Sequence, residues 1–307
     1  MNNMQRISYI AHQDIDVKKW DSCVENASNS RVYSLSWHLD RTAETWDALV
    51  MGDYQFVMPL PVKKKWGIPY LYHPLFCQQL GIFPNPTEET ARLFYLELTT
   101  RFRYFNIQIN AQNPLVQSPN EIEFLPRRNY ILSLDRNYED IYNDYSTNTK
   151  RNLAKAQKNR LSFISGIGTE EFMLFKAANL PVKLRKSDLA KLKRLTAFGQ
   201  HQGYGRFYGV YGPKNELLSA VYFCRFKNRL TYMNAVSSEE GKALGAMPFL
   251  IDQVIRENAG KNLVLDFEGS MIPGVARFYE GFGASPETYF QLKYNRLPLL
   301  LKWLKQK

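Results

Sequence analysis

Cysteine and histidine are scarce in this sequence, which has three cysteines and four histidines among its 307 residues. Cys23, Cys77 and Cys224 are far apart and form no Cys-x-x-Cys pair, and the histidines show no metal-ligand spacing. This pattern excludes a disulfide-stapled scaffold and a zinc-finger-type module. Because unpaired cysteines are typical of a reducing compartment, we expect a cytoplasmic protein that binds no metal.

Long apolar runs are also missing. No stretch approaches the roughly 20 apolar residues that a membrane-spanning helix needs. The N-terminal sequence MNNMQRISYIAHQDID lacks the basic and then apolar regions of a signal peptide. The C-terminal sequence YNRLPLLLKWLKQK is amphipathic as a helix, and it would either cap the core or lie on an anionic membrane surface. We therefore expect a soluble protein for which peripheral membrane contact stays open.

Apolar residues are abundant, at 45% with 14% aromatic residues, so the chain can build a substantial core and is not disordered. Lysine and arginine outnumber aspartate and glutamate by 40 to 29, which gives a formal net charge of +11. Such a charge favours an anionic partner, namely nucleic acid, acidic lipid head groups or a phosphorylated small molecule. Composition alone does not choose among them.

Two stretches of the chain have the same order of predicted elements. From Trp46 and again from Phe207, three apolar strands follow one another across polar turns, and a helix and a further strand come next. The spacing of about 160 residues is typical of a duplicated domain rather than of a short repeat. We therefore predict an α+β fold with two tandem domains, 1–135 and 136–307, each a mixed, mostly antiparallel sheet flanked by helices.

The segment STNTKRNLAKAQKNRLSF, residues 146–163, contains five basic residues and no acidic one. Ser146 is a candidate N-cap, and a helix from there places Arg151, Lys155 and Lys158 on one face. Like charges at this spacing repel, so a bound anion or an acidic neighbouring surface would stabilise the helix. Two interpretations stay open, an anion-binding site and a solvated helix face.

A second segment of interest runs from Asn234 to Ile255. A strand is predicted to end at Asn234–Val236, a loop then carries Gly241 and Gly245, and a helix follows from about Ala246. Glycine permits close backbone approach, and a helix start offers free N–H groups to a phosphate. The alternative interpretation is a plain junction between a loop and a helix.

A third segment, LVLDFEGSMIPGVARFYEGFGASPE, begins with a short apolar strand. This strand delivers Asp266 and Glu268 to its carboxyl end, where open α/β sheets usually bind ligands. One of the two carboxylates could act as a base, or either could form a salt bridge with the excess of basic residues.

These three segments together resemble the acyl-CoA-binding core of the GNAT superfamily of N-acyltransferases. Lys242, Gly245, Ala246 and Met247 fall on the family's pyrophosphate loop, Arg/Gln-x-x-Gly-x-Gly/Ala, with Lys at its first position and Met at its last. The sequence FYEGFG, 278–283, is similar to the family's Phe-Tyr-Glu helix with a spacing one residue shorter.

The basic segment is similar to the Fem-like branch, whose members carry two GNAT-like domains in tandem. Arg151, Lys155, Ala156 and Lys158 fall on matching positions of that branch, and DFEGS fits its Asp-x-x-Gly motif. Fem proteins transfer amino acids from aminoacyl-tRNA to a lipid-linked peptidoglycan precursor, and they commonly carry an inserted helical arm. Residues 169–202 are too few for a long hairpin, which favours the smaller acyl-transferring relatives.

The resemblance implies an N-acyltransferase that moves an acyl group from acetyl-CoA or another acyl-CoA to a primary amine, amino sugar or peptide. The resemblance and the residue patterns above together give three sets of predicted site residues: catalytic Tyr279, Glu268 and Asp266; donor-binding Asn234, Ala235, Val236, Lys242, Gly245, Ala246 and Met247; and substrate-binding Lys150, Arg151 and Lys155. Two alternatives remain, a transferase that takes its amino acid from tRNA and acts on a cell-wall precursor, and a GNAT-like module that binds without catalysis.

Overall fold

The computed structural model describes residues 6–116, 122–180 and 184–298. These residues form two compact units, unit 1 (Met1–Arg127 with Thr288–Lys307) and unit 2 (Arg128–Glu287). The expected domain ranges, 1–135 and 136–307, stay a prediction. The C-terminal amphipathic segment runs from Tyr294 to Lys307, and its residues 299–307 lie outside the described residues, whereas Tyr294 and Asn295 end the last strand. Within the described part of the chain, no helix combines the length and apolarity needed to cross a bilayer.

Unit 1 contains the first of the two predicted strand series, and its three strands and following helix are confirmed. Thr87 caps that helix by accepting a hydrogen bond from the Thr90 amide. The elements are β1 (Ile7–Ile10), η2 (His12–Asp14), α1 (Val17–Asn26), η3 (Val32–Ser34), α2 (Ser36–Thr42), β2 (Trp46–Met51), β3 (Phe56–Lys65), β4 (Ile68–Leu71), α3 (Glu88–Arg101), β5 (Tyr104–Ile109) and, from the end of the chain, β12 (Ser285–Asn295).

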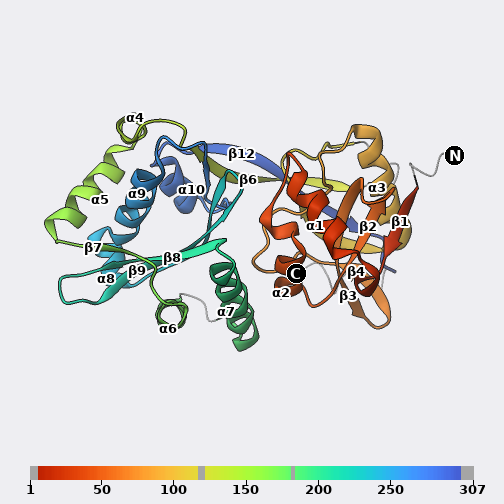
Figure 1. Ribbon diagram of the computed structural model, residues 1–307, viewed down its shortest axis with the longest axis horizontal. Coiled ribbons are helices and arrows are strands. Elements are labelled where there is room, and N and C mark those ends of the chain that lie inside the picture. Colours follow the sequence, from red (N-terminus) through yellow and green to blue (C-terminus); the bar gives the residue numbers. More distant parts are fainter. Residues whose placement is uncertain (1–5, 117–121, 181–183, 299–307) are drawn as a thin grey trace. The chain divides into compact units, whose positions relative to one another are not determined.

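Unit 2 contains the second strand series and the basic helix, both as predicted (Figure 1). Ser146 caps the basic helix, because its side chain accepts a hydrogen bond from the Thr149 amide. The elements are β6 (Glu123–Ser133), α4 (Tyr138–Asn143), α5 (Thr147–Lys158), β7 (Ser162–Ser165), α6 (Thr169–Asn179), α7 (Lys186–His201), β8 (Gly205–Tyr211), β9 (Leu217–Phe226), β10 (Arg229–Ser237), α8 (Glu239–Leu244), α9 (Ala246–Asn258), β11 (Val264–Asp266) and α10 (Pro273–Glu280).

The same strand order occurs twice. It runs β1-β2-β3-β4-β5-β12 for one set of strands and β7-β8-β9-β10-β11-β6 for the other. In each set the fourth and fifth strands pair in parallel, and the other pairings between neighbours are antiparallel. All twelve strands nevertheless belong to one sheet. A mixed α+β fold is therefore confirmed, whereas two tandem domains with a sheet each are not.

Helices cover both faces of the sheet in unit 2, with α5 and α9 on one face and α6 and α7 on the other (Figure 1). Successive side chains along each strand point to opposite faces of the sheet, so they pack alternately against the two layers of helices. Tyr208 and Phe223 belong to the core under α9, whereas Phe207 packs against Phe172 of α6 at a ring distance of 4.8 Å. The site residues of the second strand series therefore lie between two layers of helices.

Candidate functional site

Strands β10 and β11 separate from each other in the middle of β10. They pair only over Arg229–Thr231 and Val264–Asp266, after which β11 ends while β10 continues to Ser237. A β-bulge between Tyr232 and Asn234 follows directly. A bulge re-aims side chains and interrupts ladder pairing, and a strand edge without its neighbour exposes N–H and C=O groups. We call residues 232–236 of β10 the open edge.

The predicted donor-binding residues Asn234, Ala235 and Val236 form part of this open edge. Asn234 and Val236 are buried and Ala235 is half-buried. On its other side the strand stays paired with β9, because Ala235 lies opposite Val221 in the ladder. The segment is therefore held rigidly along one side and open along the other.

Tyr279 of α10 lies beside the open edge. Its ring stacks on Phe267 at 4.6 Å and meets Tyr232 edge-on at 6.1 Å. Burial raises the pKa of the Tyr279 phenol, and the charges of Glu268 and Asp266 raise it further. The phenol therefore stays neutral at physiological pH and serves as a hydrogen-bond donor rather than as a base.

Asp266 is engaged in an ion pair. It is 1% exposed, its Oδ2 lies 2.5 Å from Arg229 Nη1, and its Oδ1 accepts a hydrogen bond of 2.9 Å from the Glu268 amide. Arg229 also approaches Glu287 at 3.8 Å. Asp266 therefore forms the salt bridge that was one alternative predicted from the sequence. A role of Asp266 as a base stays a prediction.

Glu268 has the less usual geometry of the two carboxylates. It is half-buried in the loop after β11, with a left-handed backbone at φ +57°. Non-glycine residues in this region are strained, and such strain gathers at functional sites. The Glu268 charge also adds to burial in raising the pKa of Cys224 to about 12. Its carboxylate therefore lies close enough to Cys224 and Tyr279 to influence both, and its role as the base stays a prediction.

The predicted pyrophosphate loop is wrong in its conformation, because residues 239–244 form helix α8. Ser238 caps α8 by accepting a 3.0 Å hydrogen bond from the Gly241 amide, and Lys242 pairs with Glu239 at 2.5 Å. The sequence SSEEG contains the signals for such a start, a capping serine and two acids in the first turn. The glycines led to the prediction of a loop.

Gly245 joins α8 to α9 in a left-handed conformation at φ +75°. A Cβ at this position would lie 2.8 Å from the Asn152 carbonyl oxygen of α5. Glycine at position 245 therefore allows the α8–α9 junction to approach the backbone of α5 closely. Ala246 and Met247 follow as the first residues of α9, buried and partly buried respectively, and a proline comes third.

The predicted substrate-binding residues of α5 lie together on a largely exposed face. Lys150 Nζ donates to the Asn143 carbonyl at 3.1 Å, and Arg151 bonds Asn148 Oδ1 at 2.8 Å. Lys155 is exposed, and the opposite side of α5 packs against α8 and α9. Both interpretations of this basic face, anion binding and solvation, remain compatible with its geometry.

Lys176 of α6 is a polar residue of this region that sequence reasoning missed. It is 4% exposed, and its Nζ donates to the Ala235 carbonyl of the open edge at 3.2 Å. Burial lowers the pKa of Lys176 to about 8. The sequence contained one signal, because Lys176 comes four residues after Phe172 and so falls on the apolar side of α6.

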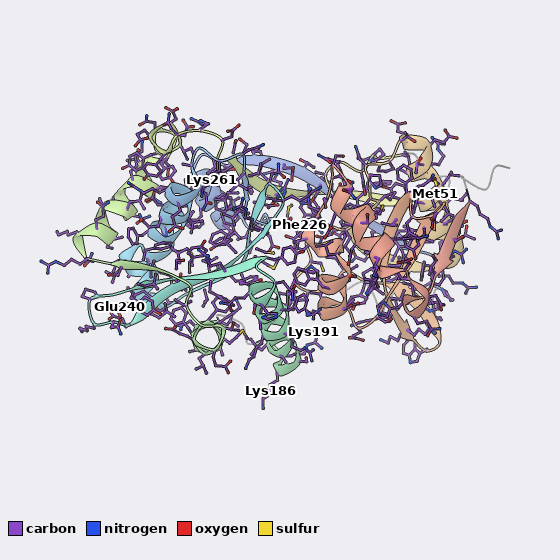
Figure 2. All side chains as sticks on the ribbon, viewed as in Figure 1. Met51, Lys186, Lys191, Phe226, Glu240 and Lys261 are labelled. Carbon is purple, nitrogen blue, oxygen red and sulfur yellow. The ribbon has the colours of Figure 1, made fainter. Side chains whose placement is uncertain are left out.

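A pocket of about 820 Å³ lies elsewhere in unit 2, near the end of α9. Arg206, Arg225 and Lys261 line it, and none of the predicted site residues does. Of these three, Lys261 is labelled in Figure 2. No group of three or more His, Cys, Asp or Glu side chains in the described ranges could hold a metal ion.

No protein-family model matches this sequence, and no curated protein sequence matches it. Several solved structures match the fold. FemX shares 14% identity with a TM-score of 0.64, over 98% of this chain and 100% of the FemX chain. A Bacteroides thetaiotaomicron protein of unknown function shares 10% with a TM-score of 0.60, over 92% and 99% of the two chains. L-PGS from Bacillus licheniformis shares 9% with a TM-score of 0.53, over 84% and 87%. The fold is therefore Fem-like, as the sequence resemblance implied.

Proposed function

We propose that this protein transfers an acyl group, specifically an aminoacyl group, from an activated carrier to a primary amine. The observation that carries the proposal is the separation of β10 from β11 beside a bulge, with Glu268 and Tyr279 next to it. An acyl group that lies along the open edge meets backbone hydrogen-bonding groups on one side. On the other side it meets a carboxylate and a neutral phenol.

The proposed chemistry follows from these groups. The neutral amine attacks the acyl carbon, a C–N bond forms, and the carbonyl becomes an oxyanion that N–H groups near Ala235 and Val236 stabilise. Glu268 accepts the proton that the amine loses. The C–O bond of an ester donor, or the C–S bond of a thioester, then breaks. The departing oxygen or sulfur accepts a hydrogen bond from Tyr279 and takes up the proton that Glu268 accepted.

Three features favour an aminoacyl ester on RNA over acyl-CoA as the donor. Helix α8 occupies the residues where a pyrophosphate loop was expected. The carbonyl oxygen of Asn152 lies against Gly245, at the place where a pyrophosphate was expected to approach the backbone. The basic face of α5 and the net charge of +11 suit an RNA backbone. The match to FemX covers all of that chain, so a long inserted arm is not needed for this fold.

Acyl-CoA is the second candidate donor, and the start of α9 favours it. A 13-residue helix begins at Ala246, directly after the left-handed Gly245. The positive end of its dipole would stabilise an anionic group placed there.

A donor panel tests the proposal. The protein is incubated with each of two donors, mixed aminoacyl-tRNA and acetyl-CoA, together with a mixture of primary amines, and amide products are detected by mass spectrometry. We expect products from aminoacyl-tRNA that are absent from a Glu268→Gln, Tyr279→Phe double variant. Products from acetyl-CoA alone would establish the second candidate. Saturable donor binding without any product would indicate a non-catalytic module.

A further inference from the structure

Lys176 carries a buried charge that no described carboxylate neutralises. Only 4% of the residue is exposed, and no carboxylate of the described residues lies within ion-pair distance of its Nζ. The Ala235 carbonyl accepts one hydrogen bond from it at 3.2 Å. The Nζ also lies 5.9 Å from the centroid of the Phe172 ring, which is a weak cation–π contact. An ammonium group has three donors, so one hydrogen bond leaves capacity for another acceptor.

Burial without a counter-charge is costly, because a lysine buried in this way loses its hydration. The lowered pKa of about 8 reflects this cost, and burial is its cause. At neutral pH the group is still mostly protonated, so the folded protein retains the positive charge. A straight apolar side chain such as methionine would fill the same space without that cost. The lysine is therefore poorly explained by stability alone.

The position of Lys176 connects the charge to the open edge. Helix α6 packs against β9 and β10 on the face of the sheet opposite α9. Asn234 of the open edge pairs with Tyr222 in the ladder, so both side chains point to one face. Tyr222 lies on the α6 side, since its ring contacts Phe207 at 4.8 Å, and that ring in turn packs on α6.

A second polar group on this face, the Tyr222 hydroxyl, lacks a hydrogen-bond partner among the described residues. The hydroxyl is buried, and the ring itself is only 1% exposed. An unsatisfied buried hydroxyl is uncommon, because it forfeits the hydrogen bonds it would make to water. The α6 face of the open edge thus contains a cation that no described carboxylate neutralises, an unsatisfied hydroxyl and the Asn234 amide.

We propose that Lys176 binds a negatively charged oxygen of the substrate at the open edge. Two sources share this chemistry, a carboxylate carried by the amine acceptor and the oxyanion that forms on the transferred acyl group. The inference rests on the proposed transfer reaction. It adds Lys176, on the α6 face of the sheet, to the residues Glu268 and Tyr279 that the reaction already uses.

Three variants test the assignment. Lys176→Met removes the charge, Lys176→Arg keeps it, and Lys193→Met is the matched control. Lys193 is a lysine of α7 that pairs on the surface with Glu170 at 2.6 Å. We expect Lys176→Met to raise the Tm by several degrees and to lower kcat/KM for transfer at least 100-fold. Lys176→Arg should recover part of that loss, and Lys193→Met should change transfer less than twofold. A lower Tm or an unchanged kcat/KM for Lys176→Met would overturn the assignment.

Two acceptors, glycylglycine and glycylglycinamide, separate the sources of the anion. If Lys176 binds an acceptor carboxylate, Lys176→Met raises KM for glycylglycine alone. If it binds the oxyanion, kcat falls equally for both acceptors. Should the wild type transfer nothing to any amine, the proposed function fails while the Tm of Lys176→Met still decides on Lys176. A rise then supports an anion site, and a fall shows that the lysine only supports Ala235.

Discussion

Replacing Gly245 by alanine tests how α5 is held against the α8–α9 junction. The residue has φ +75°, and a new Cβ would lie 2.8 Å from the Asn152 carbonyl oxygen, a backbone atom that cannot rotate away. The left-handed conformation costs a non-glycine residue about 1–2 kcal/mol. The overpacked contact costs roughly 1–3 kcal/mol more. We therefore expect Gly245→Ala to lower the free energy of unfolding of unit 2 by about 2–5 kcal/mol.

Gly260→Ala is a closely matched control, because Gly260 also has φ +75° but a Cβ there would meet nothing within 4 Å. This variant incurs the conformational cost alone, about 1–2 kcal/mol. Urea denaturation of both variants and the wild type, followed by far-ultraviolet circular dichroism, measures the difference at unchanged slope m. Equal destabilisation by the two substitutions would refute the close packing of Gly245 against Asn152.

Three further predictions concern charge and strain. Burial lowers the pKa of His38 and of His73 from 6.5 to about 4. The free energy of unfolding that each neutral histidine contributes above pH 6.5 should therefore fall by up to about 3 kcal/mol as the pH is lowered toward 4. A His38→Gln variant that loses as much stability as the wild type between pH 7.5 and 4.5 would contradict this. Glu268→Gly should relieve the left-handed backbone strain and raise the free energy of unfolding by about 1 kcal/mol, while the rate of transfer falls at least tenfold. Unchanged transfer kinetics would show that Glu268 takes no part in the reaction. Arg229→Met should leave Asp266 buried and unpaired, at a cost of about 3–5 kcal/mol in urea denaturation, and a loss below 1 kcal/mol would show that the pair is dispensable.

The strands and most helices could be predicted because their signals are local. Polar turns separate the apolar runs from Trp46 and from Phe207, and each run became a strand. Ser146 predicted the start of α5 because an N-cap acts on amides three residues away. Such short-range chemistry is visible in any window of the sequence.

The pairing of distant strands could not be predicted in the same way. Strand β6 follows the first strand series in the chain but pairs with β11, and β12 comes last but pairs with β5. Nothing in the residues of either strand specifies a partner so far away in sequence. The order of elements therefore indicated a duplication, while the single sheet was not foreseen.

Site chemistry was predictable in location and less so in detail. Asp266 and Glu268 lie close enough to Tyr279 to raise its pKa, and the catalytic roles of all three residues stay a prediction. The ion pair of Asp266 with Arg229 depends on a contact between strands, and the burial of Lys176 depends on where α6 packs. Both are tertiary properties that a residue pattern does not contain.

Hydrogen–deuterium exchange with and without donor tests the central claim most directly, because it reports where an activated acyl carrier touches the backbone. The measurement compares the free protein with the protein saturated by a non-hydrolysable aminoacyl-RNA analogue. If the acyl carrier lies along the open edge, exchange slows at residues 232–236 of β10 and in the loop that contains Glu268. Protection confined to the pocket lined by Arg206, Arg225 and Lys261, with unchanged exchange along the open edge, would contradict it.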